Sequence, residues 1–249
     1  MFLLACYTGV SRWQHNLNPD DTTIPTWSQL GKGVVKCLEI NDRSGERWLV
    51  VDTKATGFRL LLGLLLGVSG AICLGLLMGC FATVEACLAP TMSILAKVPP
   101  TAALAVFFVL VGTDTEMYVT MIAFGILPTL SQSIYLAVRE VHEELIYKAY
   151  TLGASPLELI WNVIIRAILP KMLDAVRLQI GPALVYLIAA EMVVSDVGFG
   201  YRIRLQSRLL NMNIVYPYLA GLAAFGFAVD YGLMALQKAF FPWFGREKQ

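Results

Sequence analysis

Charged side chains are scarce in this sequence: only 15% of its 249 residues are Asp, Glu, Lys or Arg, whereas 57% are hydrophobic. Soluble domains carry roughly 25% charged residues, so this composition argues against an ordinary soluble protein. The 19 basic and 18 acidic residues nearly cancel, which gives no reason to expect a nucleic-acid partner. With a mean hydropathy of +0.64, the chain is expected to be an integral membrane protein.

Metal-binding and nucleophilic residues are also few. The two histidines, His15 and His142, lie outside the apolar stretches, and the five cysteines form no CxxC or Cys/His set. We therefore expect no metal centre, no redox disulfide and no catalytic triad, which disfavours an intramembrane enzyme. Residues 1–10 lack a basic start and a following cleavage site, so no cleavable signal is expected.

Five apolar stretches dominate the rest of the chain. They cover about 60–84, 88–112, 117–138, 173–195 and 214–241, and a membrane-spanning helix needs about 20 residues. The second stretch is irregular, because Pro99 and Pro100 disfavour helix there and Lys97 places a charge beside them. The sequence thus predicts an all-α polytopic membrane protein with about five transmembrane helices.

Small residues recur every four positions in the first of these stretches. Such a stripe lets two helix backbones approach closely, and it is the usual contact surface of membrane helices. A face that leaves room for a substrate is the alternative interpretation. The stripe consists of Gly63, Gly67, Ala71, Gly75 and Gly79.

The segment 139–171 is too polar at its start to span a membrane and too regular to be a loop. Glu144 and Lys148 are spaced for an i,i+4 ion pair on a first short helix. The apolar residues of this helix fall together on another side, which predicts an amphipathic element. They are Val141, Leu145, Ala149 and Leu152.

A second short helix is expected immediately after Gly153. This glycine stands where a left-handed C-cap is favoured, and Ser155, Pro156 and Glu158 form the capping box that opens a helix. The helix is expected to end at Leu169-Pro170. Its apolar face consists of Leu157, Ile160, Trp161, Ile164, Ile165 and Ile168. Two amphipathic helices joined at a glycine make a rigid elbow outside the bilayer, suited to docking another protein.

This elbow resembles the coupling loop of bacterial ABC importer permeases. The run TLGAS at 151–155, with Ala149 before it and Leu169-Pro170 after it, is similar to that family's pattern, although Tyr147 and Lys148 replace its first Glu-Ala. Three further segments resemble the nitrate-, sulfonate-, taurine- and bicarbonate-type branch. They are NPDDTTIPTWSQL at 18–30, KVPPTAALAVFFVLVG at 97–112 and AAEMVVSDVGFGYRI at 189–203. Residues 1–10 then correspond at most to a remnant of a first helix.

The resemblance implies a type I ABC importer-like permease subunit of the bacterial inner membrane, not itself an enzyme, which binds no cofactor because ATP is bound by a partner. It implies three partners besides lipid: a cytoplasmic ABC ATPase dimer, a second permease of the same or a homologous chain, and a periplasmic or lipid-anchored solute-binding protein. No nucleic acid is expected. We expect three regions: an N-terminal polar or interfacial region (1–57), a transmembrane permease domain (58–241) and a C-terminal tail (242–249). The coupling loop 139–171 of the permease domain is expected in the cytoplasm. The implied ATPase-coupling residues are Tyr147, Lys148, Ala149, Leu152, Gly153, Ala154, Ser155 and Glu158.

The expected substrate path involves Lys97, Pro99, Pro100 and Glu191. Lys97 either attracts a small anionic solute or extends its ammonium group to the membrane surface. Glu191 either gates the path or is a hydrogen-bonded structural carboxylate.

Several alternatives stay open. The 196–213 turn, which the resemblance places on the periplasmic side, contains Arg202, Arg204 and Arg208. These basic residues either contact acidic residues of the binding protein or form a solvated face. An ion-coupled secondary transporter is the alternative function, with Glu191 and Asp230 as its ion-binding candidates, but it leaves the elbow unexplained. The sequence specifies neither the solute nor whether the partner permease is a second copy.

Overall fold

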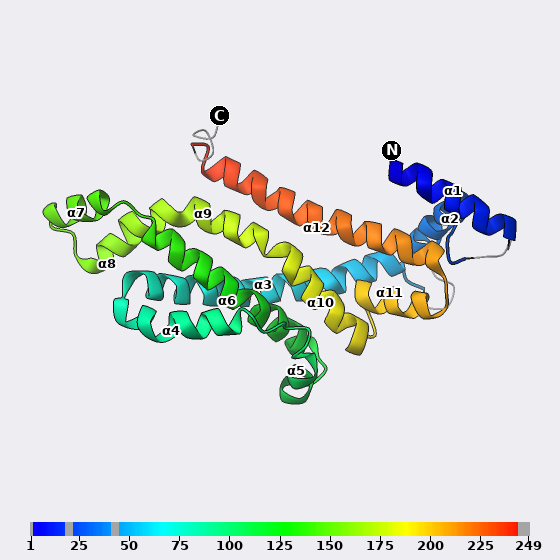
Figure 1. Ribbon diagram of the computed structural model, residues 1–249, viewed down its shortest axis with the longest axis horizontal. Coiled ribbons are helices and arrows are strands. Elements are labelled where there is room, and N and C mark those ends of the chain that lie inside the picture. The colour runs from blue at the N-terminus through cyan, green and yellow to red at the C-terminus, as the bar shows by residue number, and fades with distance from the viewer. Residues whose placement is uncertain (1, 18–21, 41–44, 244–249) are drawn as a thin grey trace. The chain divides into compact units, whose positions relative to one another are not determined.

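A computed structural model describes residues 2–17, 22–40 and 45–243 of the chain (Figure 1). Arg246, Glu247 and Lys248 of the expected tail lie outside these described residues. Within them the chain is helical, with one isolated β-bridge between Ile40 and Arg47 and no strand. The helices are α1 (Phe2–Leu17), α2 (Trp27–Leu38), α3 (Trp48–Cys80), α4 (Ala82–Leu95), α5 (Leu104–Val111), α6 (Thr115–Arg139), α7 (Glu143–Thr151), α8 (Pro156–Leu159), the π-helical turn η1 (Ile160–Ile164), α9 (Ile165–Leu178), α10 (Ile180–Val194), α11 (Phe199–Arg208) and α12 (Met212–Phe240).

Four helical stretches in the described part of the chain are long and apolar enough to cross a membrane. They are Trp48–Cys80, Thr115–Arg139, Pro156–Val194 and Met212–Phe240. These four correspond to the first, third, fourth and fifth predicted spans. The first begins well before the apolar run, because residues 48–59 already belong to α3.

The second predicted span, about 88–112, is not one continuous helix. It is divided between α4 and α5, and residues 96–103 between them form turns. Pro99 and Pro100 lie within this break, where the missing amide donors and the restricted preceding residue oppose a helix. Pro90, in contrast, is accommodated inside α4.

The prediction that a helix ends at Leu169-Pro170 is wrong. Pro170 lies in the interior of α9, which continues to Leu178. The side-chain amide of Gln237, in α12, donates a hydrogen bond to the carbonyl oxygen of Pro170 at 3.1 Å. A neighbouring helix thus supplies polar contact at the proline, as is usual where membrane helices contain one.

The described chain separates into two compact units. One comprises residues 1–59 and 187–225, and the other comprises residues 60–186 and 226–249. We call them the Glu191 unit and the elbow unit, after the sites that they contain. The helices α3, α10 and α12 each contribute residues to both.

In the elbow unit, the small-residue stripe of α3 lies against α6. An added Cβ would approach the side chain of Ile122 to 2.7 Å from Gly63, that of Ile126 to 2.6 Å from Gly67, and that of Val138 to 2.6 Å from Gly79. Ala71 is fully buried in the same core, which also contains the end of α6 and much of α9. The absent side chains thus allow α3 and α6 to pack closely, the arrangement that small residues permit between membrane helices.

In the Glu191 unit, a second core joins α2, α11 and the start of α12. Its buried members are Cys37, Phe199, Ile203, Ile214, Val215 and Tyr218. Burial raises the pKa of the Cys37 thiol to about 11, because the thiolate would lose its hydration there. The helix α1 is held to the entry of α2 by two hydrogen bonds, from the Tyr7 hydroxyl to the Pro25 carbonyl (2.7 Å) and from the Trp27 indole to the Thr8 hydroxyl (3.2 Å).

Candidate functional site

The glycine turn and the capping box of the elbow have the geometry that the sequence predicts, whereas Leu145 and Leu152, two members of the predicted apolar face of the first helix, are exposed. The helix α7 ends at Thr151, and Gly153 follows with φ of +82°, in the left-handed region that favours glycine. The Ser155 hydroxyl accepts from the Glu158 amide at 3.4 Å, and the Glu158 carboxylate accepts from the Ser155 amide at 2.8 Å. This reciprocal capping box fixes the direction of α8 relative to the glycine turn.

A π-helical turn joins α8 to α9, and it determines which side of the elbow is buried. The buried residues are Leu159, Ile164, Ile168 and Met172. Leu159 and Ile164 are five residues apart, which is the spacing of a π-turn, and each later step is four. The π-turn therefore keeps Leu159 in line with the buried side of α9.

This change of phase corrects the predicted apolar face of the second helix. Leu157 and Trp161 were expected to lie with Ile164 and Ile168, but they are 70% and 67% exposed. A uniform α-helical period places all four residues on one side, and the π-turn separates them. Together with Leu152, which is 88% exposed, they give the elbow an outward apolar surface.

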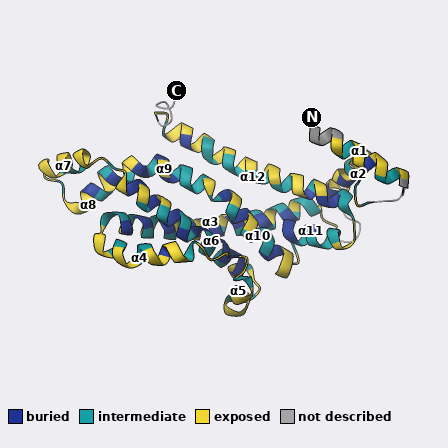
Figure 2. Cartoon of the chain, in the orientation of Figure 1, coloured by how far each residue is buried: buried dark blue, intermediate teal, exposed yellow. Residues whose placement is uncertain are grey.

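The anchored side of the elbow packs on the ends of the long helices. Ile146, Ala149, Ile160 and Val163 lie against the core that contains Ala71 of α3 and Leu130 and Ile134 of α6. The predicted Glu144–Lys148 pair is confirmed at 3.6 Å, on an exposed side of α7. Figure 2 shows mainly exposed residues along α7 and the turn that follows it. The elbow is thus a rigid projection with a buried base and an apolar exterior.

Tyr147, Lys148 and Ser155, three of the predicted coupling residues, are exposed on this projection. Ala149 and Ala154 are half-buried at its base, whereas Glu158 is exposed but engaged in the capping box. The elbow therefore brings the predicted coupling residues together in one short segment.

The predicted path residues lie in different units. Lys97 and Pro99 are exposed in the break between α4 and α5, whereas Pro100 is buried. A Cβ added at Gly125 of α6 would lie 3.0 Å from the Pro100 ring, which shows how closely the break packs on that helix. Lys97 and the two prolines thus belong to the elbow unit, whereas Glu191 belongs to the other unit.

Glu191 is fully buried, and three groups donate hydrogen bonds to its carboxylate. The Thr56 hydroxyl donates at 2.9 Å to one oxygen and at 3.1 Å to the other, Arg59 Nη1 donates at 2.8 Å, and the Gly200 amide donates at 3.0 Å. A Cβ at Gly198 would lie 2.5 Å from a carboxylate oxygen, and this glycine has φ of +124°. The turn between α10 and α11 thus needs glycine both for its backbone and for its approach to Glu191.

A second buried carboxylate, Asp52, holds the same turn from α3. It accepts from the Gly198 amide (3.0 Å), from Arg202 Nε (2.9 Å) and from the Tyr218 hydroxyl (2.8 Å). The Arg202 guanidinium also lies 4.5 Å from the centre of the Trp48 ring. These contacts tie α3, α11 and α12 to one turn.

The structure therefore shows what two of the three basic residues near this turn contact. Arg202 pairs with buried Asp52, and Arg204 donates to the carbonyl oxygens of Val193 and Ser195. Arg208 is exposed. Sequence reasoning missed Asp52, Thr56 and Arg59. Their spacing of four and three residues puts them on one side of a helix, which was the available signal.

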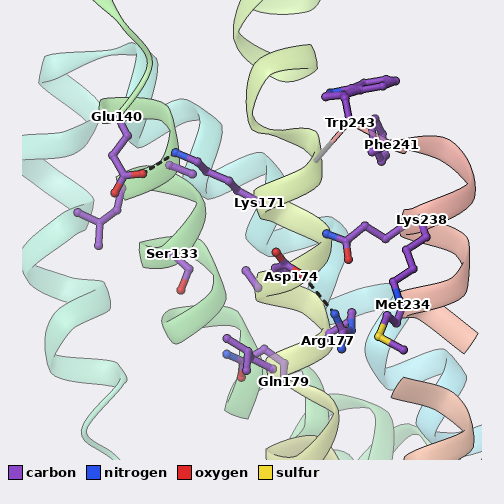
Figure 3. A pocket seen from close by; sticks show the side chains of 15 residues that line it. Ser133, Glu140, Lys171, Asp174, Arg177, Gln179, Met234, Lys238, Phe241 and Trp243 are labelled. Carbon is purple, nitrogen blue, oxygen red and sulfur yellow. Dashed lines mark hydrogen bonds and ion pairs between the residues drawn. The ribbon is translucent and has the colours of Figure 1, made fainter. Parts of the chain in front are cut away.

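A cavity of about 890 Å³ lies in the elbow unit between α6, α9 and the end of α12 (Figure 3). Lys171 and Glu140 pair across it at 2.7 Å, and Arg177 contacts Asp174 at 3.3 Å. Arg177 also binds Asp230 of α12 at 3.1 Å. Arg177 thus neutralises Asp174 and Asp230, which are the acidic residues that interrupt the fourth and fifth predicted spans beside this cavity. Among the described residues no cluster of His, Cys, Asp and Glu is suited to hold a metal ion.

Residues 71–246 match the family described as "Binding-protein-dependent transport system inner membrane component". The chain belongs to this family. It is therefore a multi-pass inner-membrane permease subunit of an ABC transporter and not an enzyme. The match covers the elbow, the break with its two prolines, and the α10–α11 turn.

Known relatives agree with the branch that the sequence indicates. The chain is 30% identical to the taurine transport system permease protein TauC of Escherichia coli (strain K12), over 75% of this chain and 68% of that protein. It is 28% identical to the putative aliphatic sulfonates transport permease protein SsuC of Bacillus subtilis (strain 168), over 75% and 67% of the two chains.

A solved structure confirms the fold. A chain of the MetNI methionine ABC transporter, in an inward-facing conformation, matches with a TM-score of 0.66. The match covers 77% of this chain and 96% of that one at 17% identity, so it shows a shared fold and nothing about function. The all-α permease architecture predicted from the sequence is thus confirmed.

Proposed function

We propose that this permease lines the path of an ATP-driven importer and is moved by a cytoplasmic ABC ATPase dimer that docks on the elbow at Gly153. The observation that carries the proposal is the exposed apolar surface of Leu152, Leu157 and Trp161 on an elbow whose other side is buried. Exposed aromatic and aliphatic groups on a rigid base are typical anchors of a protein interface. Leu157 and Trp161 stand at the start of the Pro156–Val194 stretch, close to the glycine turn, where a soluble partner can reach them.

The packing at the base of the elbow supports transmission of movement. Leu159, Ile164 and Ile168 are part of the core that includes α3 and α6. Because a close-packed core transmits displacement, closure of two ATPase subunits would move these helices together with the elbow. A second permease subunit, of the same or a homologous chain, would complete the path.

With the elbow in the cytoplasm, we place the α10–α11 turn on the periplasmic side. A periplasmic or lipid-anchored binding protein would deliver the solute there. The fixed turn around Gly198 offers a rigid contact surface there. Arg202 and Arg204 are engaged within the chain, so exposed Arg208 is the basic residue best placed to meet acidic groups of that protein.

The proposed solute is a small molecule that carries an oxyanion group, like the nitrate, sulfonates, taurine and bicarbonate of the related branch. Two relatives are named for taurine and aliphatic sulfonates. Lys97 is exposed beside the helix break and supplies a positive charge. Glu191 does not oppose this, because Arg59 pairs with it at 2.8 Å and cancels its charge. We expect Lys97→Met to lower uptake of the anion while leaving ATPase binding intact; unchanged uptake would remove Lys97 from the path.

The ATPase partner is tested by purification in mild detergent, with the bound proteins identified and counted by mass. We expect an ABC ATPase at equal copy number with wild-type chain and its loss with Trp161→Ser. The matched control is Trp13→Ser, since Trp13 is 64% exposed and Trp161 is 67% exposed. Recovery of the chain alone, under conditions that preserve other transporter complexes, would contradict the proposal.

A further inference from the structure

The helix α2 has three distinct sides, which is one more than a simple amphipathic helix has. Gly33 and Cys37, four residues apart, are buried. Trp27, Val34 and Leu38 follow i, i+7, i+11 spacing and form a second, exposed apolar side, with Val35 at its edge. Lys32 and Lys36 lie on the remaining polar side, and both are exposed.

The buried side places α2 at the end of a membrane-spanning helix. A Cβ at Gly33 would overlap the backbone carbonyl of Asn213, in the first turn of α12. Cys37 packs in the core with Ile214 and Val215 of the same turn. Since α12 is long and apolar enough to cross the membrane, α2 lies at the level where that crossing begins.

The exposed apolar side is large for a surface in contact with water. Trp27, Val34, Val35 and Leu38 are 53%, 44%, 52% and 49% exposed, and no other described residue covers these parts of their side chains. The lysines adjoin this surface on one helix flank. Apolar groups with a Trp, bordered by basic groups at the boundary of a span, match the acyl and phosphate layers of a bilayer surface.

We propose that α2 is an interfacial helix, with Val34, Val35 and Leu38 in the acyl layer of one leaflet and Lys32 and Lys36 at its lipid phosphates. The helix holds the start of α12 at a fixed depth through its contact at Asn213. The lipid contact rests on the geometry of α2 and on membership of a membrane-protein family. Only the choice of leaflet, the outer one, rests on the orientation proposed above.

The test is spin-label accessibility in nanodiscs of phosphatidylethanolamine and phosphatidylglycerol, with the full chain and its natural cysteines replaced by alanine. Single labels are placed at Val34, Leu38, Ser28 and Lys32. Labels at Phe227, exposed near the middle of α12, and at Leu152, exposed on the elbow, calibrate lipid and water. We expect positions 34 and 38 to collide mainly with oxygen, like position 227. Positions 28 and 32 should collide mainly with a water-soluble nickel chelate, like position 152.

Two results would overturn the proposal. High nickel accessibility at 34 and 38 would mean a water-exposed helix, and exclusion of both reagents there would mean a protein cover. A second measurement needs no substitution: photoactivatable phosphatidylglycerol should label Val34 and Leu38 in the wild-type chain and leave Ser28, on another side of α2, unlabelled. An absence of lipid adducts on 34–38, with adducts on α12, would contradict the proposal. Neither measurement depends on the ATPase or on transport.

Discussion

Replacement of Gly153 by valine should weaken ATPase docking through backbone strain. Gly153 has φ of +82°, and no atom lies within 4 Å of an added Cβ, so the chain itself imposes no steric clash. A left-handed conformation costs a residue with a side chain roughly 1–2 kcal/mol. That cost lowers the population of the docking-competent elbow by about 5- to 30-fold, and the apparent Kd for the ATPase should rise by the same factor.

The assay is titration of the permease in nanodiscs with its purified ATPase, with Gly153→Asn as the matched control. Asparagine is close to valine in size but tolerates the left-handed region, so it should preserve binding within a few-fold. Membrane insertion should be unchanged in both variants. If asparagine and valine weakened binding equally, the added volume and not the backbone would be responsible; if neither did, the elbow would not be the docking site.

Three further predictions concern the core of the protein. Asp52→Ala should destabilise the chain by about 3–5 kcal/mol, because it leaves the guanidinium of Arg202, whose side chain is only 13% exposed, without its carboxylate. Thermal unfolding in detergent measures this, and a Tm equal to wild type would contradict it. Gly75→Val should disrupt packing of α3 on α6, since an added Cβ would lie 2.8 Å from the Ser131 carbonyl oxygen, and a fully folded variant by the same measurement would refute the close contact. Cys37 should resist alkylation at pH 8 in the folded protein, because burial raises its pKa to about 11, and it should react after unfolding. Mass spectrometry detects the modified cysteine, and rapid modification of Cys37 in the folded chain would disprove this.

The parts of the fold that local rules govern could be predicted from the sequence. The capping box at Ser155, the glycine at 153 and the four-residue stripe starting at Gly63 each depend on neighbours within one helix or turn. The break at Pro99-Pro100 was likewise visible as an irregularity. These features suffice to recognise the family and the elbow.

Long-range partners could not be predicted in the same way. Glu191 and Arg59 are 132 residues apart, and Asp52 and Arg202 are 150 apart, so no local pattern connects them. The continuation of α9 through Pro170 depends on a side chain from α12. The exposed side of the elbow was misjudged at Leu157 and Trp161 because a single π-turn alters the helical period.

The π-turn at Ile160–Ile164 also has a consequence for how related permeases can diverge. A π-turn holds one more residue per hydrogen-bonded ring than an α-helix, so η1 is equivalent to a one-residue insertion in the helix that follows the elbow. Loss of that residue would leave Leu159 four residues before Ile164 in a regular α-helix, so Leu159 would stay on the buried side of α9. Leu157, six residues before Ile164 in that case, would stay off the buried side. The elbow of a related permease can therefore keep the same exposed surface with a gap of a single position in this segment.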